Sequence, residues 1–94
     1  MTLVGQDKID QFIKRHAQAC KPMQAWLAEV NSAQWRTSQD IKNRYRAADF
    51  LKDNRVIFDV KGNSYRILVK IAYQASVVLV ERVGTHAEYD KWRL

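Results

Sequence analysis

The sequence predicts a single α+β domain in which a short N-terminal strand and a helical hairpin pack on an antiparallel β meander, with a short C-terminal helix. The first half of the chain has apolar residues at helical spacing, and the second half changes to β-branched and aromatic runs that alternate. Its 94 residues, of which 47% are hydrophobic, suffice for one core and are too few for two. We therefore expect residues 1–94 to form one domain.

The first half is expected to contribute a strand and two helices. Residues 1–4, "MTLV", are apolar enough for a strand that ends at Gly5. Residues 6–19 carry the stripe of an amphipathic helix, formed by Ile9, Phe12, Ile13 and His16. After a break at Lys21-Pro22 a second helix is expected, because proline suits a first helical turn. Its buried stripe consists of Met23, Trp26, Leu27 and Val30.

A short third helix is expected after residue 37. Thr37 and Asp40 have the spacing of a capping box, in which each side chain accepts a hydrogen bond from the other residue's backbone. Two side chains can then face the core, Ile41 and Tyr45. Three cations face solvent, namely Lys42, Arg44 and Arg46.

The second half predicts three antiparallel strands, at residues 55–60, 64–73 and 77–83, joined by connectors of hairpin length. One face of the middle strand is expected to be core, and it carries Tyr65, Ile67, Val69, Ile71 and Tyr73. The other face is expected to be open, with Arg66 and Lys70 on it and Arg55 and Lys61 beside them. Four cations on an open sheet face can hold phosphates. The alternative is an ordinary solvated face.

The overall charge supports a polyanionic partner. The chain has 16 Lys and Arg against 10 Asp and Glu, a net charge of +6. Nucleic acid is the first candidate for such a partner, although many small proteins are basic. The lone cysteine, Cys20, forms no internal disulfide and has no neighbouring zinc ligands. The first residues have neither a basic leader nor a long apolar run, so we expect a cytoplasmic protein with no membrane segment.

The last residues, "VGTHAEYDKWRL", contain a candidate catalytic pair. Thr85 and Glu88 again have capping-box spacing, so a helix is expected to begin at His86 with Tyr89 one turn further on the same side. An imidazole exchanges protons near neutral pH, and a phenol can donate a proton or a hydrogen bond. The alternative is a histidine with a structural role near a turn.

Three segments closely resemble the HigB family of bacterial toxins, which belongs to the RelE-like superfamily. They are "IKNRYRAADFL", "RVIFDVKGNSYRILVKIAY" and "VGTHAEYDKW". The resemblance covers nearly the whole chain. Its most specific parts are Gly62-Asn63-x-Tyr65-Arg66 and Gly84-Thr85-His86-x-Glu88-Tyr89-Asp90.

This resemblance implies the toxin of a type II toxin–antitoxin pair, an mRNA interferase that cleaves mRNA on ribosomes and inhibits translation. It implies a HigA-like antitoxin with a helix-turn-helix, which neutralises the toxin and through which alone the complex binds operator DNA. The implied reaction needs no metal or cofactor. The ribose 2′-OH attacks the adjacent phosphorus, which leaves a 2′,3′-cyclic phosphate and a 5′-OH.

The implied catalytic residues are Arg66, His86 and Tyr89. A guanidinium can grip two phosphate oxygens, so Arg66 would stabilise the developing charge. His86 would be the general base or acid, and Tyr89 the second proton carrier or a platform for a base. The cations expected to bind RNA are Lys42, Arg46, Arg55, Lys61, Lys70 and Lys91.

Two other functions stay open at this point. The RelE toxins proper rely on lysines, arginines and a late tyrosine with no histidine, so the division of acid and base between His86 and Tyr89 is not fixed. The chain could bind RNA or the ribosome without cutting, or inhibit gyrase as the ParE-like members of the fold do. The presence of both His86 and Tyr89 favours the nuclease, because electrostatic binding alone requires neither.

Overall fold

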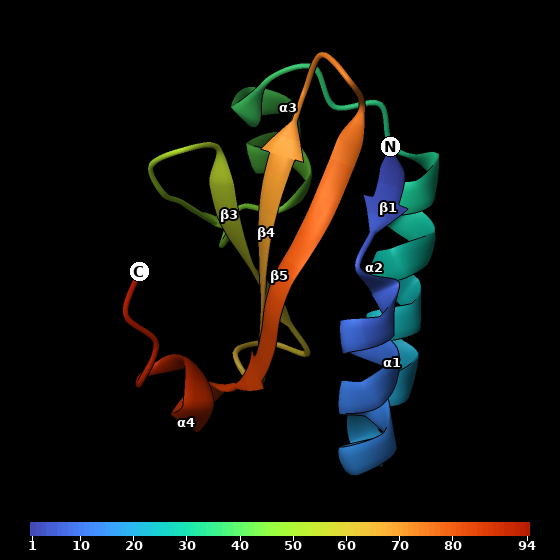
Figure 1. Cartoon of the computed structure of the whole chain (residues 1–94), viewed down its shortest axis with the longest axis vertical. Helices are drawn as coiled ribbons and strands as arrows, with labels where there is room; N and C mark the ends of the chain where they lie inside the picture. The colour runs from blue at the N-terminus through green and yellow to red at the C-terminus, as the bar shows by residue number, and fades with distance from the viewer.

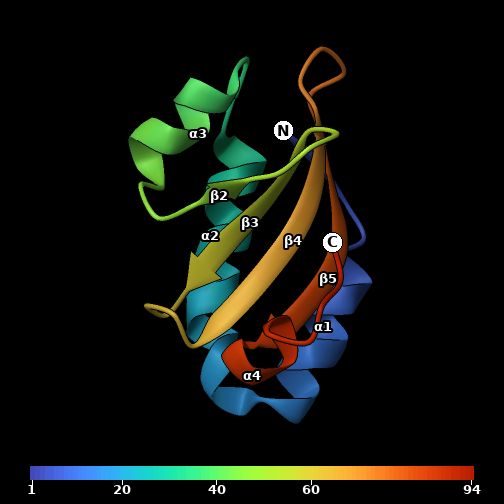
Figure 2. The same cartoon turned by 90° about the vertical axis from the view of Figure 1, so that its left-hand side faces the viewer.

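A five-stranded sheet carries two long helices on one face and a single-turn helix on the other (Figures 1 and 2). The computed structural model describes all residues, 1–94. The elements in chain order are β1 (Thr2–Val4), α1 (Gln6–Arg15), η1 (a 3₁₀ turn, Ala17–Ala19), α2 (Cys20–Ser32), α3 (Ser38–Arg44), β2 (Asp49–Phe50), β3 (Arg55–Val60), β4 (Tyr65–Ala72), β5 (Val77–Thr85) and α4 (His86–Tyr89). The predicted α+β class is confirmed.

The sheet has the strand order β1-β5-β4-β3-β2. The strands β3, β4 and β5 form the antiparallel meander that the sequence predicted. The N-terminal strand β1 joins the sheet beside β5 and runs parallel to it, while the two-residue strand β2 was not predicted and pairs with the opposite edge. The longest helix has 13 residues, and no helix reaches the length and apolar character that crossing a bilayer requires.

The helical hairpin differs from the prediction at its break. Helix α1 ends at Arg15, His16 leaves helical geometry with φ −132°, and the turn η1 leads directly into α2. The break therefore lies before Cys20, earlier than the predicted Lys21-Pro22. Proline is tolerated as the third residue of α2, because the N–H groups of a first turn have no intrahelical partner.

The core lies between the two long helices and the sheet. Both predicted helical stripes contribute to it, through Ile9 and Phe12 of α1 and through all four predicted residues of α2. Phe58 of β3 is its aromatic centre, with ring contacts to Trp26 at 5.4 Å and Trp35 at 5.8 Å between centroids. The core face of β4 is also as predicted, since Tyr65, Ile67, Val69 and Ile71 are buried there and Tyr73 packs against its edge.

The second face of the sheet is less open than the sequence predicted. Arg66 is only 8% exposed, and its neighbours Leu68 and Ile57 are 2% and 1% exposed. Figure 2 shows α4 and the C-terminal segment lying in front of the sheet, on the side opposite α1 and α2. The prediction of an open face was therefore wrong at this end of β4, because the chain folds back over it after β5. Lys70, further along the strand, is exposed as predicted.

A β-bulge in β5 decides which of its residues face α4. Leu68 of β4 pairs with Arg82, whereas the next residue, Val69, pairs with Val80, so Glu81 is an extra residue in β5. An extra residue reverses the alternation of side chains along a strand. Val78 and Val80 face the core before the bulge, and Arg82 and Gly84 face the α4 side after it.

Candidate active site

The candidate site lies where the ends of three strands meet α4. Asp59 of β3, Arg66 of β4 and Gly84 of β5 are neighbours in register across the sheet. Helix α4 follows β5 directly, and the His86 N–H donates to the Ser64 carbonyl at 3.0 Å. This bond fixes the first residue of α4 against the start of β4. The two sequence motifs, at residues 62–66 and 84–90, are thereby brought into contact.

Helix α4 has only one turn, and its capping box stabilises it. The Thr85 N–H donates to Glu88 Oε1 at 2.9 Å, and the Glu88 N–H donates to Thr85 Oγ1 at 3.2 Å. The predicted cap and the predicted first helical position of His86 are confirmed. The backbone N–H of Thr85 holds the pKa of Glu88 below its ordinary value, and the Thr85 hydroxyl adds to this effect. The helix start that carries His86 is therefore fixed by backbone and side-chain bonds that do not involve the imidazole.

Gly84 allows the C-terminal segment to pack closely on β5. A Cβ atom at this position would lie 2.8 Å from the ring of Trp92 and 3.2 Å from Cβ of Glu88. The first distance is shorter than real contacts of this kind. A glycine is needed here for close approach, and its backbone does not have positive φ. The absence of a side chain beside Arg66 therefore brings α4 onto the sheet.

Arg66 and His86 are in direct contact. The guanidinium Nη2 lies 3.3 Å from His86 Nδ1. Arginine has only donors, so Nδ1 must be the acceptor and must carry a lone pair. In the neutral imidazole the proton then sits on Nε2, which faces Asp90 Oδ2 at 3.7 Å. One nitrogen of His86 thus points at the guanidinium, and the other points at a carboxylate.

Asp59 also contacts Arg66 and was not predicted as a site residue. Its Oδ1 lies 3.0 Å from Arg66 Nη1, but the pair is outside hydrogen-bond geometry, and Nη1 and Nε of Arg66 have no hydrogen-bond partner. Burial raises the pKa of Asp59 above its ordinary value, and the charge of Arg66 opposes this rise. Alternation along β3 places Asp59 on the same face as Arg66. Only the strand register reveals that it lies opposite Arg66.

The ring of Tyr89 lies against the other side of the guanidinium. Arg66 Cζ is 5.0 Å from the ring centroid, within the range of a cation–π contact. The rings of His86 and Tyr89 are 6.2 Å apart, as expected for neighbours one turn apart on one side of a helix. All three residues that the resemblance implied as catalytic therefore meet at one point. Together with Asp59 they form the Arg66–His86 cluster. A guanidinium that contacts an imidazole and a phenol ring forms a group that can bind a phosphate and exchange protons with the atoms attached to it.

The cations expected to bind RNA are spread more widely. Arg55 and Lys70 are paired in register, four residues along the strands from the Asp59–Arg66 pair, which corresponds to roughly 13 Å. Lys61 is exposed in the turn between β3 and β4, and Lys91 is exposed after α4. These two cations therefore lie near the cluster in the chain, while Arg55 and Lys70 lie further along the sheet.

The remaining two expected cations lie at the β2 edge. Lys42 donates to the Ala48 carbonyl at 3.2 Å, and its ammonium is 5.8 Å from the ring centroid of Phe50. Arg46 is exposed just after α3. Figure 2 shows α3 at the opposite end of the molecule from α4. The structure does not bring Lys42 and Arg46 to the Arg66–His86 cluster.

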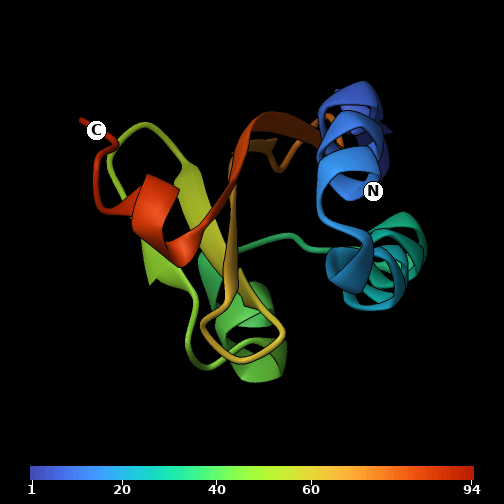
Figure 3. The same ribbon diagram turned by 90° about the horizontal axis from the view of Figure 1, so that it is seen from below.

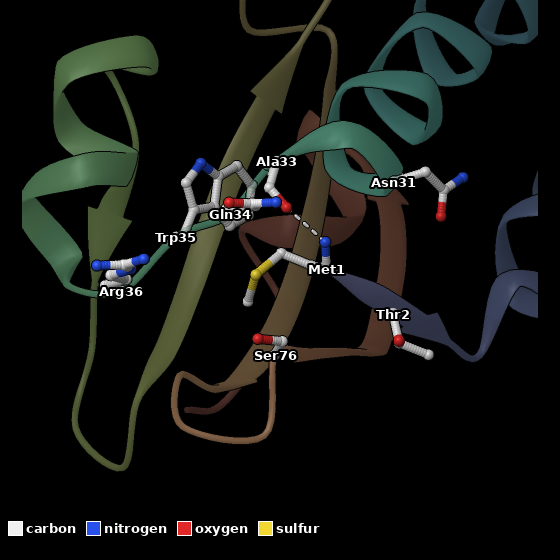
Figure 4. Close-up of a pocket in the computed structure, with 8 residues that line it drawn as sticks. All are labelled: Met1, Thr2, Asn31, Ala33, Gln34, Trp35, Arg36 and Ser76. Atoms are coloured by element: carbon white, nitrogen blue, oxygen red, sulfur yellow. Dashed lines mark hydrogen bonds between the residues drawn. The ribbon is translucent and has the colours of Figure 1, made fainter.

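The largest cavity, of about 390 Å³, also lies away from the cluster (Figure 4). It is formed by the N-terminus, the segment after α2 and the turn between β4 and β5. The Met1 amino group donates to the Ala33 carbonyl there, and the Thr2 N–H donates to the Ser76 carbonyl. None of the candidate site residues lines this cavity.

Comparison with known proteins identifies one family. Residues 19–92 match the family model HigB_toxin, described as the RelE-like toxic component of a toxin-antitoxin system. The match includes α2 and α3, the meander, and α4 with the whole Arg66–His86 cluster. The comparison with curated proteins found no match.

Proposed function

The chain belongs to the HigB toxin family, the RelE-like toxic components of toxin–antitoxin systems, and we propose that it is an endoribonuclease that cleaves mRNA on the ribosome. The observation that carries this proposal is the contact between Arg66 and His86 inside a cluster that also contains Tyr89. A surface that binds RNA by charge alone requires neither a buried guanidinium nor an imidazole in contact with it.

The proposed reaction is attack of the ribose 2′-OH on the adjacent phosphorus. The new bond joins O2′ to phosphorus, and the bond from phosphorus to O5′ breaks. His86 takes the 2′-OH proton at Nδ1, because this lone pair already points at the guanidinium that would hold the phosphate. The Tyr89 hydroxyl gives a proton to the leaving O5′. The products are a 2′,3′-cyclic phosphate and a 5′-OH, and the transfer uses no redox partner.

Arg66 would stabilise the negative charge that grows on the phosphate oxygens. Its Nε and Nη1 nitrogens are buried and Nη1 is paired with Asp59, so Nη2, which contacts His86, is the nitrogen that would bind a substrate phosphate. The Nη2 donor would move from His86 to the phosphate, which frees Nδ1 for the 2′-OH. Donors that are placed before the reaction typically account for about 10² to 10³ in rate.

Two carboxylates would support these groups. Asp90 faces Nε2 of His86, so it would stabilise the imidazolium that forms when Nδ1 takes a proton. Asp59 holds the guanidinium from the other side and limits its motion. Neither carboxylate is placed to touch the reacting atoms, so both would act as positioning residues.

The exposed cations would guide the RNA to this cluster. Lys61 and Lys91 lie nearest to it in the chain, and the Arg55–Lys70 pair would extend the path along the sheet. Lys42 and Arg46, at the opposite end, would contact more distant RNA, for which the ribosome supplies an extended polyanionic surface. A toxin that acts on ribosomes works in the cytoplasm.

A toxin of this kind has an antitoxin partner, and we propose that it is a HigA-like protein with a helix-turn-helix. An unrestrained nuclease would kill its host. We therefore expect a neighbouring gene for a helix-turn-helix protein of about a hundred residues. Operator DNA would be bound through that protein. A gene that stands alone and is harmless when expressed would contradict this part of the proposal.

Mapping of the 5′ ends of cellular mRNA after brief induction of the toxin tests the proposed activity. Discrete new 5′ ends that carry a hydroxyl support the nuclease. Arrested translation without new ends would indicate a non-catalytic inhibitor that binds RNA or the ribosome. DNA damage without mRNA cleavage would indicate a gyrase inhibitor. Induction of the His86→Gln variant at matched level is the control for ends that arise from expression of the protein without its catalytic activity.

A further inference from the structure

A basic groove lies on the other side of β5 from the Arg66–His86 cluster. It has a volume of about 240 Å³ and lies between α1, the end of β5 and the C-terminal segment. Figure 3 shows α4 and α1 on either side of the end of β5. The groove is lined by Lys8, Gln11, Arg15, Arg82, Val83 and Trp92. No cation among these was expected from the sequence to bind RNA.

The groove has three cations and no acidic side chain among its lining residues. Lys8, Arg15 and Arg82 are all exposed, and none of them takes part in an ion pair. Lys8 Nζ lies 3.5 Å from the Val80 carbonyl, a weak bond that leaves its charge uncompensated. One acidic side chain outside the lining, Glu88 of α4, is influenced by Arg15, although its pKa is lowered mainly by the backbone N–H of Thr85. The groove is therefore a site of unbalanced positive charge.

Trp92 adds an aromatic surface and links the groove to the cluster. The Arg82 guanidinium lies 5.9 Å from the Trp92 ring centroid. The Trp92 ring meets Tyr89 edge-on at 5.6 Å, and Tyr89 in turn lies against Arg66. Two aromatic rings, Tyr89 and Trp92, thus connect the guanidinium of Arg66 to that of Arg82. Trp92 is only partly buried, so an edge or face of its indole is free to contact a ligand.

We propose that this groove is a second RNA subsite, which holds backbone phosphates next to the scissile one on its cations and stacks one base on Trp92. The inference rests on the proposed nuclease function and extends it to the path of the RNA. Positive grooves with aromatic stacking surfaces are how proteins bind single-stranded nucleic acid without reading its sequence. The groove is close to Arg66 in space, because Trp92, which lines it, contacts Tyr89, and Tyr89 lies against Arg66.

The geometry favours RNA over an acidic protein segment as the occupant. An acidic segment needs only the cations. The Trp92 ring packs against Tyr89 and on Gly84, where the lack of a side chain leaves room for it. It supplies a flat apolar surface that carboxylates do not use. Nucleobases do use such a surface. The β5 bulge contributes as well, because it turns Arg82 to the face where Trp92 lies.

Equilibrium binding of a labelled 12-nucleotide uridine RNA in the His86→Gln background tests the subsite without cleavage. Exchange of both Arg15 and Arg82 for Gln should lower affinity on the order of tenfold. It should also reduce the slope of log K against log salt by about 1.4, since each lost contact to a single strand removes about 0.7. The matched control exchanges Lys14 and Lys21 for Gln. Both are exposed cations outside the groove, and their loss should leave affinity and slope nearly unchanged.

Trp92 provides a separate readout. The other two of the three tryptophans, Trp26 and Trp35, are buried, so quenching of fluorescence by RNA should come from Trp92. Trp92→Leu should remove the quenching and lower affinity about tenfold, whereas Trp92→Phe should lose the quenching and keep most of the affinity. The charge variants keep Trp92, so they test the groove even if Trp92→Leu unfolds.

Three results would overturn the subsite. They are equal loss of affinity in the groove and control variants, no loss in either, and no measurable RNA binding by the His86→Gln protein in low salt. Competition by a poly-glutamate peptide as effective as that of RNA would show that an acidic protein segment fits the groove equally well, and this also contradicts the proposal. If mRNA is still cleaved on ribosomes in these cases, only the subsite fails and the proposed nuclease function stands.

Discussion

Arg66 Nη2 lies 3.3 Å from His86 Nδ1, although the two residues are 20 positions apart in the chain. The contact is made by the antiparallel pairing of β4 with β5 and by the single turn of α4 that follows. It determines which nitrogen of His86 has a lone pair, because arginine can only donate. The other two nitrogens of the guanidinium are buried, so a phosphate bound by Nη2 would lie beside the basic nitrogen of His86.

Replacement of Arg66 should remove activity and also cost stability. Arg66→Ala leaves the half-buried Asp59 carboxylate without its cation, so the free energy of unfolding should fall by about 1–3 kcal/mol. Cleavage per folded molecule should fall by about 10² to 10³. The double variant Asp59→Asn/Arg66→Ala is the control, because it should recover stability and stay inactive. An Arg66→Ala protein that cleaves at the full rate per folded molecule would show that the site is elsewhere.

His86→Gln should be folded and nearly inactive. The cap of α4 is made by Thr85 and Glu88, and the bond to Ser64 uses the backbone, so the helix does not depend on the imidazole. A Gln side chain exchanges no proton near neutral pH. Single-turnover cleavage should therefore fall on the order of 10²-fold or more, with antitoxin affinity unchanged.

Replacement of Asp90, whose carboxylate faces His86, is the control for the His86→Gln variant. Asp90→Asn should reduce cleavage by roughly tenfold, less than His86→Gln, because Asp90 only stabilises the charge that His86 acquires. A His86→Gln protein that unfolds or loses its antitoxin while cutting normally per folded molecule would assign His86 a structural role.

Removal of the Tyr89 hydroxyl separates its two proposed contributions. Tyr89→Phe keeps the ring against Arg66 and the edge contact with Trp92, so folding should be unchanged. The proton for O5′ is lost, and cleavage should fall by about 10². Measurement uses the same single-turnover assay. Full activity in Tyr89→Phe, together with loss in Tyr89→Leu, would mean that the ring alone matters and that another group protonates O5′.

Gly84→Ala should disturb the site through packing. The new methyl group would press against the Trp92 ring and Cβ of Glu88, which is expected to cost about 1–3 kcal/mol and to move α4 away from β5. Cleavage per folded molecule should fall with it. Gly62→Ala is the comparison. Gly62 has φ +64° with no atom near its Cβ position, so that variant should lose stability and cut normally.

The stability of α4 should depend on acid through Glu88. The pKa of Glu88 is lowered in the folded protein by the Thr85 N–H. Its stabilising contribution is therefore complete above the unfolded value, about 4.3, and is lost as the pH falls through the lower folded value. The pKa of Asp59 is raised by burial, so protonation of Asp59 acts in the opposite direction.

Urea unfolding at pH 7 and pH 3 measures this dependence. Glu88→Gln should show a smaller loss of stability between the two values than the natural protein, because Gln keeps the capping geometry and has no charge to lose. Asp10→Asn, which changes an exposed carboxylate of α1, is the control and should follow the natural protein. An equal pH dependence in all three proteins would contradict the role of the Glu88 charge.

Local pattern was enough to predict much of this molecule. The stripe of the second helix, the meander and both capping boxes depend on residues a few positions apart and were confirmed, whereas the first helix ends before the predicted His16. The break between α1 and α2 was predicted too late in the chain. The prediction assumed that the second helix starts at Pro22, but proline is also tolerated as the third residue of a helix, which is its position in α2. The two-residue strand β2 has too few residues to produce a pattern at all.

The missed parts of the site depend on register, which no local pattern contains. Asp59 was visible as a residue of the second sheet face, but its pairing with Arg66 follows only from how β3 aligns with β4. The β5 bulge turns Arg82 and Gly84 to this face, and its only trace in "VVLVERV" is the adjacent polar pair Glu81-Arg82 between Val80 and Val83. The burial of Arg66 also required the C-terminal segment to fold back over the sheet, and Gly84 was the one residue that could have indicated it.

A single atom of the substrate tests the central claim most directly. A ribosome-bound reporter mRNA with 2′-deoxyribose at one mapped cleavage position lacks the proposed nucleophile there and is otherwise unchanged. We predict that the natural protein does not cut this mRNA at the altered position and cuts it normally at unaltered ones, with 5′-OH ends. Cleavage at the deoxyribose position at the normal rate would mean that water is the nucleophile, and it would contradict the proposed transfer of the 2′-OH proton to His86.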